Sequence, residues 1–383
     1  MKIIQWFSEH GSAIFRWLWL PLVLTFVAVL LSIPRHRLHK FFDSIGFRGY
    51  DGKLPRHTKT STVTPYLKKL RFRTTVPFIE WDKAKPTLEM FFKKRIYTIE
   101  QNRKDVRMIE IQLIQEELPN FLLWEDKFML DGSKFAIGES YRGREIWDAA
   151  TLPHGLIAGA TGGGKTALLR CIIHQTIFKC WNVTVLDFKG GGDYIQEERE
   201  AQKYRDLEDG YGPFLISDPV KARDWLLALT IEAKSRMDTF KAAEVSNIDE
   251  YNTSGKGCFV PWLLVIDEAA EIFDVKPVTK ADKELYAEIN QSLRTLARLS
   301  RAAGVHILMG FIRPSADVLD GQIKNNLLWR VSGYFADPAA SRIVLDNDKA
   351  TELPPEIKGR FVIGQEETQA YYLPVKSQTD TGH

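Results

Sequence analysis

The chain has 383 residues, of which 44% are hydrophobic and 26% are charged, and its formal net charge is +3. These values are typical of a folded protein with its own core, and they exclude a low-complexity chain. The net charge is too small to indicate a nucleic-acid partner by itself. The three cysteines form neither a CxxC pair nor a metal-binding spacing, and they are interpreted as thiols in a reducing compartment: Cys171, Cys180 and Cys258.

A long apolar segment near the N-terminus predicts one transmembrane helix over residues 14–33. No charged residue occurs from Trp17 to Ile33, and the segment reaches the ~20 residues that span a bilayer if Arg16 snorkels to the interface. Basic residues follow at once, which places the C-terminal side in the cytoplasm: Arg35, Arg37 and Lys40. Residues 1–40 are therefore expected to anchor the protein in the cell membrane by a single pass. Three alternatives are a cleaved signal peptide, a core helix of a soluble domain and an interfacial helix. The segment has no signal-peptide cleavage site, no polar side that would face solvent in a core helix, and no charged face for an interfacial helix.

Residues 41–130 predict a basic linker followed by a small adaptor domain. The stretch from Phe47 to Phe78 is rich in Lys, Arg, Thr and Pro, which indicates an irregular juxtamembrane linker that favours anionic lipid headgroups. A surface that faces DNA or a protein partner is the alternative. The adaptor is expected from about Pro77 to Leu130, where the alternating pattern DVRMIEIQLIQ predicts a half-buried strand.

Residues 131–375 predict an α/β motor domain. KFAIGES and REIWDAA are expected to form a hairpin that leads into it. Strands are expected in HGLIAGA, NVTVLDF, WLLVIDEAAEIF, VHILMGFI and LLWRVSGYF, and helices in KTALLRCIIHQTIF and AEINQSLRTLARLSRAAG. Strands that alternate with helices indicate a parallel sheet. Residues 376–383 are expected to be a polar tail.

The sequence GATGGGKT fits the phosphate-binding pattern GxxxxGKS/T. Backbone N–H groups of such a loop cradle phosphate oxygens, glycines leave room for that approach, and the following helix adds its positive end. Lys165 is expected to reach the β- and γ-phosphates of ATP, and Thr166 to hold Mg²⁺. The residues expected to bind the nucleotide here are Gly159, Ala160, Thr161, Gly162, Gly163, Gly164, Lys165 and Thr166.

The sequence LLVIDE ends a buried strand with two acidic residues, at the end of the sheet that faces ligands in α/β proteins. Asp267 is expected to hold Mg²⁺ through water. Glu268 is expected to orient and polarise the attacking water. The alternative for such an acidic pair is a simple helix cap.

From about Ile137 to Val362 the chain resembles the FtsK/SpoIIIE family of ring-forming, DNA-translocating ATPases. The resemblance rests on TLPHGLIAGATGGGKT, VLDFKGG, NIDEYN, LLVIDEAAEIF, SRAAGVHILMGFIRPSADVLDGQIKNNLLWRVSGYFADPAASRIVLD and KGRFV. It implies a RecA-like fold, a hexamer around DNA, and ATP sites completed by an arginine of the neighbouring subunit. By position that arginine is Arg301, with Arg298 and Arg330 as the alternatives, and Arg342 is expected to sense the nucleotide or support the interface.

One position departs from the family pattern, which places a glutamine before the Arg-Pro pair. Ile312 stands there and its side chain cannot form hydrogen bonds, so Arg313 or Ser315 would have to substitute. Two further segments are candidates for sequence-independent contact with DNA, the loop with Lys189 and the segment with Lys324 and Asn325. Each has a purely structural alternative.

The layout resembles the coupling proteins of conjugative plasmids and integrative elements, which bring a relaxase–DNA complex to a transfer channel. The alternatives are a chromosome- or plasmid-segregating translocase, a type VII secretion-like protein-export ATPase, and a docking module that binds nucleotide without hydrolysis. The single glycine loop counts against the export ATPase, and Glu268 counts against the docking module. Whether the DNA is single- or double-stranded stays open.

Overall fold

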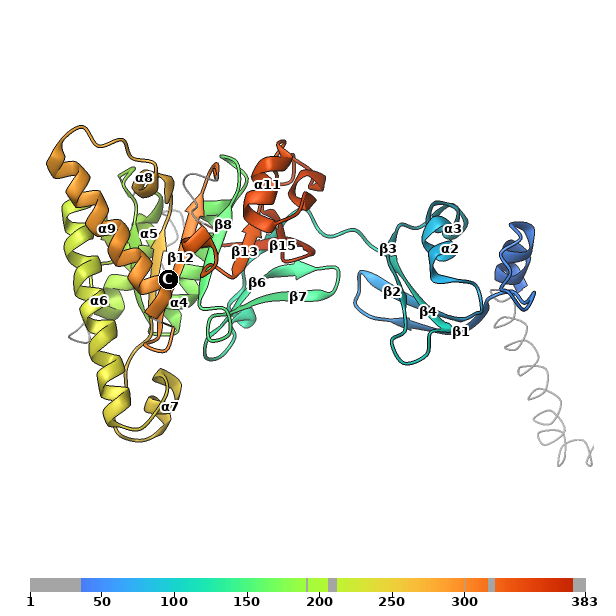
Figure 1. Ribbon diagram of the computed structural model, residues 1–383, viewed down its shortest axis with the longest axis horizontal. Coiled ribbons are helices and arrows are strands. Elements are labelled where there is room, and N and C mark those ends of the chain that lie inside the picture. Colours follow the sequence, from blue (N-terminus) through green and yellow to red (C-terminus); the bar gives the residue numbers. More distant parts are fainter. Residues whose placement is uncertain (1–35, 191, 206–211, 300, 316–320, 375–383) are drawn as a thin grey trace, which may run out of the picture. The chain divides into compact units, whose positions relative to one another are not determined.

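The computed structural model describes residues 36–190, 192–205, 212–299, 301–315 and 321–374 (Figure 1). The chain forms two compact units that divide between Glu117 and Leu118. This division precedes residue 130, where the sequence predicts the end of the adaptor. The predicted membrane helix (residues 14–33) and polar tail (residues 376–383) lie outside the described residues. None of the helices in the described part of the chain has both the length and the apolar character that a bilayer span requires.

The first unit is a four-stranded antiparallel sheet with helices on one face. Its strand order is β1-β2-β4-β3, with β1 (Arg56–Thr62), β2 (Leu67–Arg73), β3 (Ile96–Gln101) and β4 (Met108–Ile114). The prediction of an irregular linker over residues 47–78 is wrong, because β1 and β2 lie within it. In β2, Leu70 and Phe72 are buried in the core while Lys69 and Arg71 reach Glu110 on the other face. This alternation is hidden in the sequence by the many basic residues.

The core of the first unit is aromatic. Residues 36–44 are helical, and they are followed along the chain by α2 (Phe78–Lys83) and α3 (Lys85–Phe92). Phe42, Phe72 and Trp81 are fully buried against one another, with ring centroids 5.4 to 5.7 Å apart. Edge and tilted ring contacts of this kind stabilise a core beyond their buried area. The unit therefore has a core of its own.

The second unit contains one mixed sheet. Its order is β10-β9-β11-β12-β8-β13-β14-β15-β6-β7, and β5 pairs with β15. The pairs from β10 to β13 are parallel, and those from β13 to β7 are antiparallel. The predicted parallel sheet is thus one half of a longer mixed sheet, and the predicted hairpin, β6–β7, is confirmed at its far edge. The strands are β5 (Leu122–Leu123), β6 (Lys134–Ser140), β7 (Gly143–Asp148), β8 (His154–Ala158), β9 (Asn182–Leu186), β10 (Leu215–Ile216), β11 (Trp262–Ile266), β12 (Val305–Phe311), β13 (Trp329–Ser332), β14 (Arg360–Ile363) and β15 (Glu366–Tyr372).

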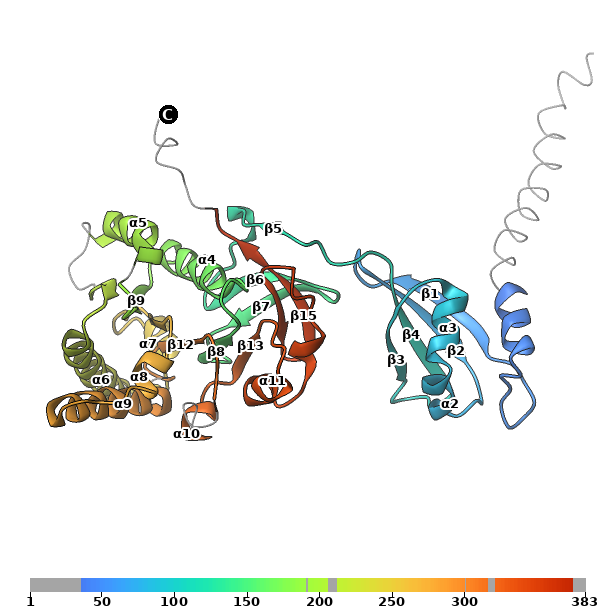
Figure 2. The same ribbon diagram turned by 90° about the horizontal axis from the view of Figure 1, so that it is seen from above.

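Helices cover both faces of the parallel half, as Figure 2 shows. α4 (Lys165–Phe178) and α5 (Ile195–Arg205) pack on one face, and α6 (Pro219–Ala242) and α9 (Lys280–Leu299) on the other. The helix predicted at residues 165–178 is confirmed. α9 begins and ends before the predicted helix at residues 287–304, and α6 has no counterpart among the predicted elements. The short helices are α7 (Ile248–Thr253), α8 (Ala270–Phe273), α10 (Gly321–Lys324) and α11 (Pro338–Leu345), with 3-10 turns η1 (Asp126–Phe128), η2 (Gly192–Tyr194) and η3 (Lys349–Glu352).

The antiparallel half is held by a close approach of two strands at Gly138. A Cβ atom on Gly138 would lie 2.1 Å from the carbonyl oxygen of Gln369 and 2.8 Å from Cα of Ala370. These residues belong to β6 and β15, which pair there. Only glycine permits this approach.

Substitution of Gly138 by alanine is expected to lower the free energy of unfolding of the second unit by about 3 kcal/mol, because the two strands must separate. Denaturant unfolding followed by tryptophan fluorescence measures this change. Gly192→Ala is the matched control, since a Cβ atom there meets nothing within 4 Å. A Gly138→Ala protein as stable as the control would contradict the account.

Candidate functional site

The glycine loop connects β8 to α4 and is fixed by backbone contacts. Gly162 and Gly164 have φ angles of +81° and +105°, which favour glycine. The N–H of Gly359 donates to the carbonyl of Gly163 at 2.9 Å, so the turn before β14 supports the loop. α4 begins after Gly164 without a side-chain cap, which leaves the N–H groups of its first turn for a ligand. A glycine cradle that opens an uncapped helix fits a phosphate group.

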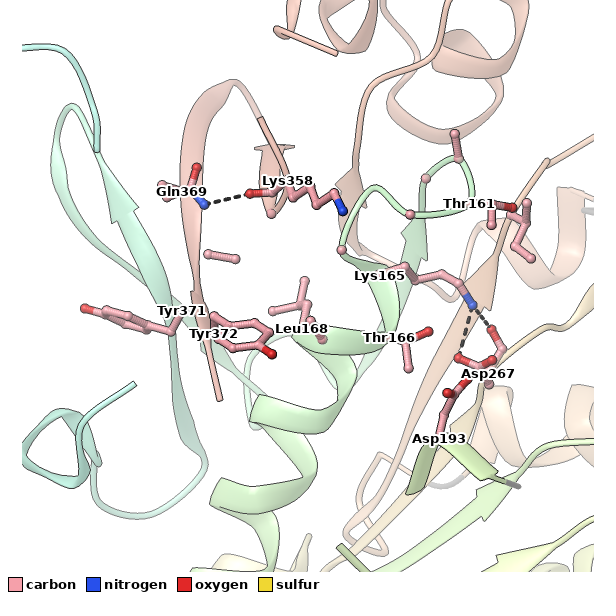
Figure 3. A pocket seen from close by; sticks show the side chains of 18 of the residues that line it. Thr161, Lys165, Thr166, Leu168, Asp193, Asp267, Lys358, Gln369, Tyr371 and Tyr372 are labelled. Atoms are coloured by element: carbon pink, nitrogen blue, oxygen red, sulfur yellow. Dashed lines mark hydrogen bonds and ion pairs between the residues drawn. The ribbon is translucent and has the colours of Figure 1, made fainter. Parts of the chain in front are cut away.

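Lys165 is buried, and its ammonium is committed to Asp267. The side chain is 6% exposed and donates to the backbone carbonyl of Asp267, and its Nζ lies 3.2 Å from Oδ1 of that residue (Figure 3). Lys165 reaches Asp267 across β12, the strand between β8 and β11. Gly310 leaves the space for this, because a Cβ atom there would lie 2.9 Å from Nζ. The positive charge of Lys165 is therefore held at the C-terminal ends of the parallel strands, where the glycine loop lies.

Asp267 is also bound by a residue that the motifs do not identify. The hydroxyl of Tyr194 donates to Oδ1 of Asp267 at 2.8 Å. Burial and the carboxylate raise the pKa of Tyr194 well above its usual value, so the phenol stays protonated and donates. No sequence motif covers Tyr194. Its position directly after the loop that contains Lys189 is the one signal in the sequence that could have identified it.

A cavity lies against the glycine loop, and a hydroxyl and two carboxylates gather at the end of it that contains Lys165. Thr166, Asp193 and Asp267 all line it there (Figure 3). Hydroxyl and carboxylate oxygens are the donors that Mg²⁺ prefers. The residues predicted for Mg²⁺, Thr166 and Asp267, are thus brought together, and Asp193 joins them. Their role as ligands stays a prediction.

Glu268 has one oxygen that is held and one that is not. Oε2 accepts the backbone N–H of Ile312 at 2.9 Å, whereas Oε1 is buried and has no hydrogen-bond partner among the described residues. Burial raises the pKa of Glu268, and Lys165, the backbone N–H groups of Ile312 and Ala270, and Lys189 oppose that rise. A buried carboxylate with an unsatisfied oxygen fits a group that polarises a water molecule. The backbone of Ile312 thus orients Glu268, while its side chain lines the cavity.

The glycine loop forms one wall of a cavity of about 490 Å³, which is large enough for a small-molecule ligand. Lys165 and Asp267 lie at one end, and Leu168 and Tyr372 lie at the other (Figure 3). The opposite wall is made by residues near β5 and by the β14–β15 region, and apart from Lys358 in KGRFV no sequence motif covers it. The residues of this wall are Phe121, Lys358, Gln369, Tyr371 and Tyr372, and the ring of Tyr371 points away from the cavity into the core (Figure 3).

Arg301 does not lie at this cavity. It is exposed in the turn before β12, at the N-terminal ends of the parallel strands, whereas the glycine loop lies at their C-terminal ends. β12 has seven residues, so the N-terminal and C-terminal ends of the strand are about 20 Å apart. Arg301 lines a separate cavity of about 630 Å³, together with Arg298. Neither arginine can therefore reach the glycine loop of its own chain.

The other predicted contact residues are engaged elsewhere. Arg342 is exposed and pairs with Asp348 at 2.6 Å, and it does not line the cavity. Arg330 and Lys324 both bind Asp346. Asn325 is exposed and lines a groove beside α9. Lys189 lines the cavity, and its Nζ lies 3.9 Å from Oε2 of Glu268, so it faces the site; its contact with DNA stays a prediction.

A glycine cradle, a buried lysine and an acidic pair on an α/β sheet define a P-loop ATPase. A model of the FtsK/SpoIIIE family matches residues 131–261. DNA translocases FtsK of Clostridium acetobutylicum and Helicobacter pylori strain J99 are each 31% identical, over 57% and 65% of this chain. The chain spans 28% and 29% of the length of these two relatives.

A solved structure extends the similarity across nearly the whole chain. The pCW3 conjugation coupling protein TcpA, in its monomer form with ATPγS, is 31% identical with a TM-score of 0.64. The alignment covers 89% of this chain and 95% of that one. EssC of Geobacillus thermodenitrificans, 18% identical with a TM-score of 0.53, shares the fold. The chain belongs to the FtsK/SpoIIIE family.

The pH dependence of ATP turnover is expected to report on Glu268. The rate should fall as the pH drops through the raised pKa of this carboxyl, because only the carboxylate accepts a proton. Lys189 lowers that pKa. Lys189→Gln should therefore move the acid limb of kcat/KM to higher pH, whereas Lys203→Gln on the exposed surface of α5 should not. An unchanged limb, or a shift to lower pH, would contradict this role of Lys189.

Proposed function

We propose that this protein is a membrane-anchored, ATP-driven DNA translocase that acts as a coupling protein in conjugative DNA transfer. In this proposal a homohexameric ring binds DNA, and ATP is hydrolysed at the interfaces between subunits. The motor lies in the cytoplasm, and a relaxase and transfer-channel proteins are its partners.

The observation that carries the proposal is the extent of the similarity to TcpA. That alignment covers 89% of this chain, so it includes most of the first unit. The two FtsK relatives match 57% and 65% of the chain at the same identity. The combination of a small sheet unit with a motor supports transfer over segregation. Segregation is the second candidate, because these FtsK relatives share the motor.

The geometry of the site supports hydrolysis as well as binding. Lys165 can exchange its contact with Asp267 for contacts with phosphate oxygens, since Lys165, Asp267 and the glycine loop line the same cavity. The free Oε1 of Glu268 is available to accept a proton from water. Thr166 and Asp267 would hold Mg²⁺, which neutralises charge on the phosphates when it is bound with ATP.

The position of Arg301 supports a ring. A guanidinium stabilises the charge of phosphoryl transfer only when it touches the phosphate. Arg301 is exposed at the N-terminal ends of the parallel strands, so it can do this only at the site of a neighbouring subunit. A head-to-tail arrangement brings Arg301 of one subunit to the glycine loop of the next, and it forms a ring when the rotation between subunits closes.

The membrane location rests on the apolar residues 14–33 and on the basic residues that follow them. Anchoring would hold the motor beside the channel through which DNA leaves the cell. The structure of the first unit supplies a folded connection between that segment and the motor.

ATP turnover by the full-length protein in detergent is expected to rise when DNA is added. Arg301→Ala should lower the DNA-stimulated rate by at least about 100-fold, because an arginine finger contributes roughly 10³–10⁵ in such reactions. Lys283→Ala, on the exposed face of α9, serves as the control and should turn over normally. Single- and double-stranded DNA in separate assays show which form is used. A rate that is insensitive to both DNA forms would contradict the proposal.

A further inference from the structure

The nucleotide cavity has two chemically different ends. Lys165, Asp193 and Asp267 make one end charged (Figure 3). Leu168, Ala370 and Tyr372 make the other end apolar and aromatic (Figure 3). A nucleotide has the same asymmetry, with a polyphosphate at one end and a flat base at the other. The aromatic end therefore faces the part of the ligand that the glycine loop does not bind.

Phe121 and Tyr372 form an aromatic pair at this end. Their ring centroids are 5.4 Å apart at an interplanar angle of 47°. Phe121 is 58% exposed, although a phenylalanine gains most from burial. Both rings line the cavity, so the pair presents apolar surface to whatever occupies it. An aromatic pair with one exposed ring and one half-buried ring, beside a phosphate-binding loop, fits a flat aromatic ligand.

The backbone holds the two rings together. β5 runs parallel to the end of β15, with Leu122 opposite Tyr371 and Leu123 opposite Tyr372. The N–H of Trp124 donates to the carbonyl of Tyr372 at 2.9 Å. Phe121, directly before β5, is thus fixed beside Tyr372 before any ligand binds.

Two nearby polar side chains are already engaged. The amide of Gln369 donates to the carbonyl of Lys358 at 3.0 Å and accepts from Nε of Arg360 at 2.9 Å. The hydroxyl of Tyr371 donates to Glu139 at 2.7 Å. These groups cannot read the edge of a base without breaking their own hydrogen bonds. Neither side chain is therefore free to read the edge of a base.

We propose that Phe121 and Tyr372 form the platform on which the base of the bound nucleotide stacks. The proposal rests on phosphate binding by the glycine loop, as in the proposed function. It assigns to residues 118–124, which lead from the first unit into the motor, a direct part in nucleotide binding. Because stacking uses ring faces, the platform accepts adenine and guanine with little discrimination.

The same segment is tied to the glycine loop through Arg360. This buried guanidinium donates from Nη2 to the carbonyls of Pro119 and Leu118, at 3.0 and 3.3 Å. Gly359, its neighbour, donates to Gly163 of the glycine loop. A base held by Phe121 therefore stabilises a segment that is already bonded to the phosphate end of the site.

Calorimetric titration of the full-length protein with ATPγS and with inorganic tripolyphosphate tests the platform. Phe121→Ala should weaken ATPγS about tenfold, the size expected for loss of a stacked base, and leave tripolyphosphate unchanged. Tyr372→Ala should do the same, while Tyr372→Phe and Phe121→Trp, which keep a ring, should retain ATPγS affinity. Leu123→Ala is the matched control, since this residue is exposed on the same strand and does not line the cavity.

Equal affinity of the Phe121→Ala and parent proteins for ATPγS would overturn the proposal. An equal loss of ATPγS and tripolyphosphate would overturn it too, because Phe121 would then act on the phosphate end. GTPγS should bind within about tenfold of ATPγS, and a larger gap would show that the edge of the base is read. Hydrogen exchange at residues 122–124 should slow with ATPγS but not with tripolyphosphate. A protein that binds nucleotide in this way but ignores DNA would refute the proposed function alone.

Discussion

The buried ammonium of Lys165 is the constraint on which the rest of the motor depends. A charge with only 6% of its side chain exposed must be paired, since an unpaired buried ion costs several kcal/mol. Asp267 can pair with it only because β8 and β11 flank β12 in parallel, which brings their C-terminal ends to one edge. Gly310 keeps the path between them open. The apolar strands, the helices on both faces and the buried Tyr194 together hold this one arrangement in place.

The glycine loop and Arg301 lie at opposite ends of the parallel strands. The C-terminal ends of the strands carry the glycine loop, Asp267 and Glu268. Arg301 lies at the N-terminal ends, one strand length away. In the proposed ring, each subunit would supply the glycine loop to one site and Arg301 to the site of its neighbour, because one chain cannot bring the two together. The far end of the cavity adds a third element, because Phe121 belongs to the segment that leads in from the first unit. In this account one nucleotide would contact the motor, its neighbour and the connection toward the membrane.

Local patterns in the sequence predicted the parts of the site that are contiguous in the chain. The glycine loop, α4 and the acidic pair follow from short motifs, because each motif is one strand end and one turn. Tyr194, Phe121 and Tyr372 were missed, since their roles depend on contacts across 73 or more residues, such as that from Tyr194 to Asp267. The rest of the antiparallel half beyond the predicted hairpin β6–β7 was missed for the same reason. β1 and β2 were misread because β1 is mostly exposed and polar, and basic residues separate the few buried apolar residues of β2. Arg342 pairs with Asp348 and does not line the cavity.

A mixture of two inactive proteins tests the central claim, that each site is built from two subunits. Lys165→Ala removes the receiving half and Arg301→Ala removes the donated half, so each protein alone should be inactive with DNA. In a mixed ring, an intact Lys165 site of one subunit can receive an intact Arg301 of the other. Recovery of a substantial part of the parent's ATP turnover on mixing is the predicted result. A mixture that stays as inactive as its components would contradict the shared site.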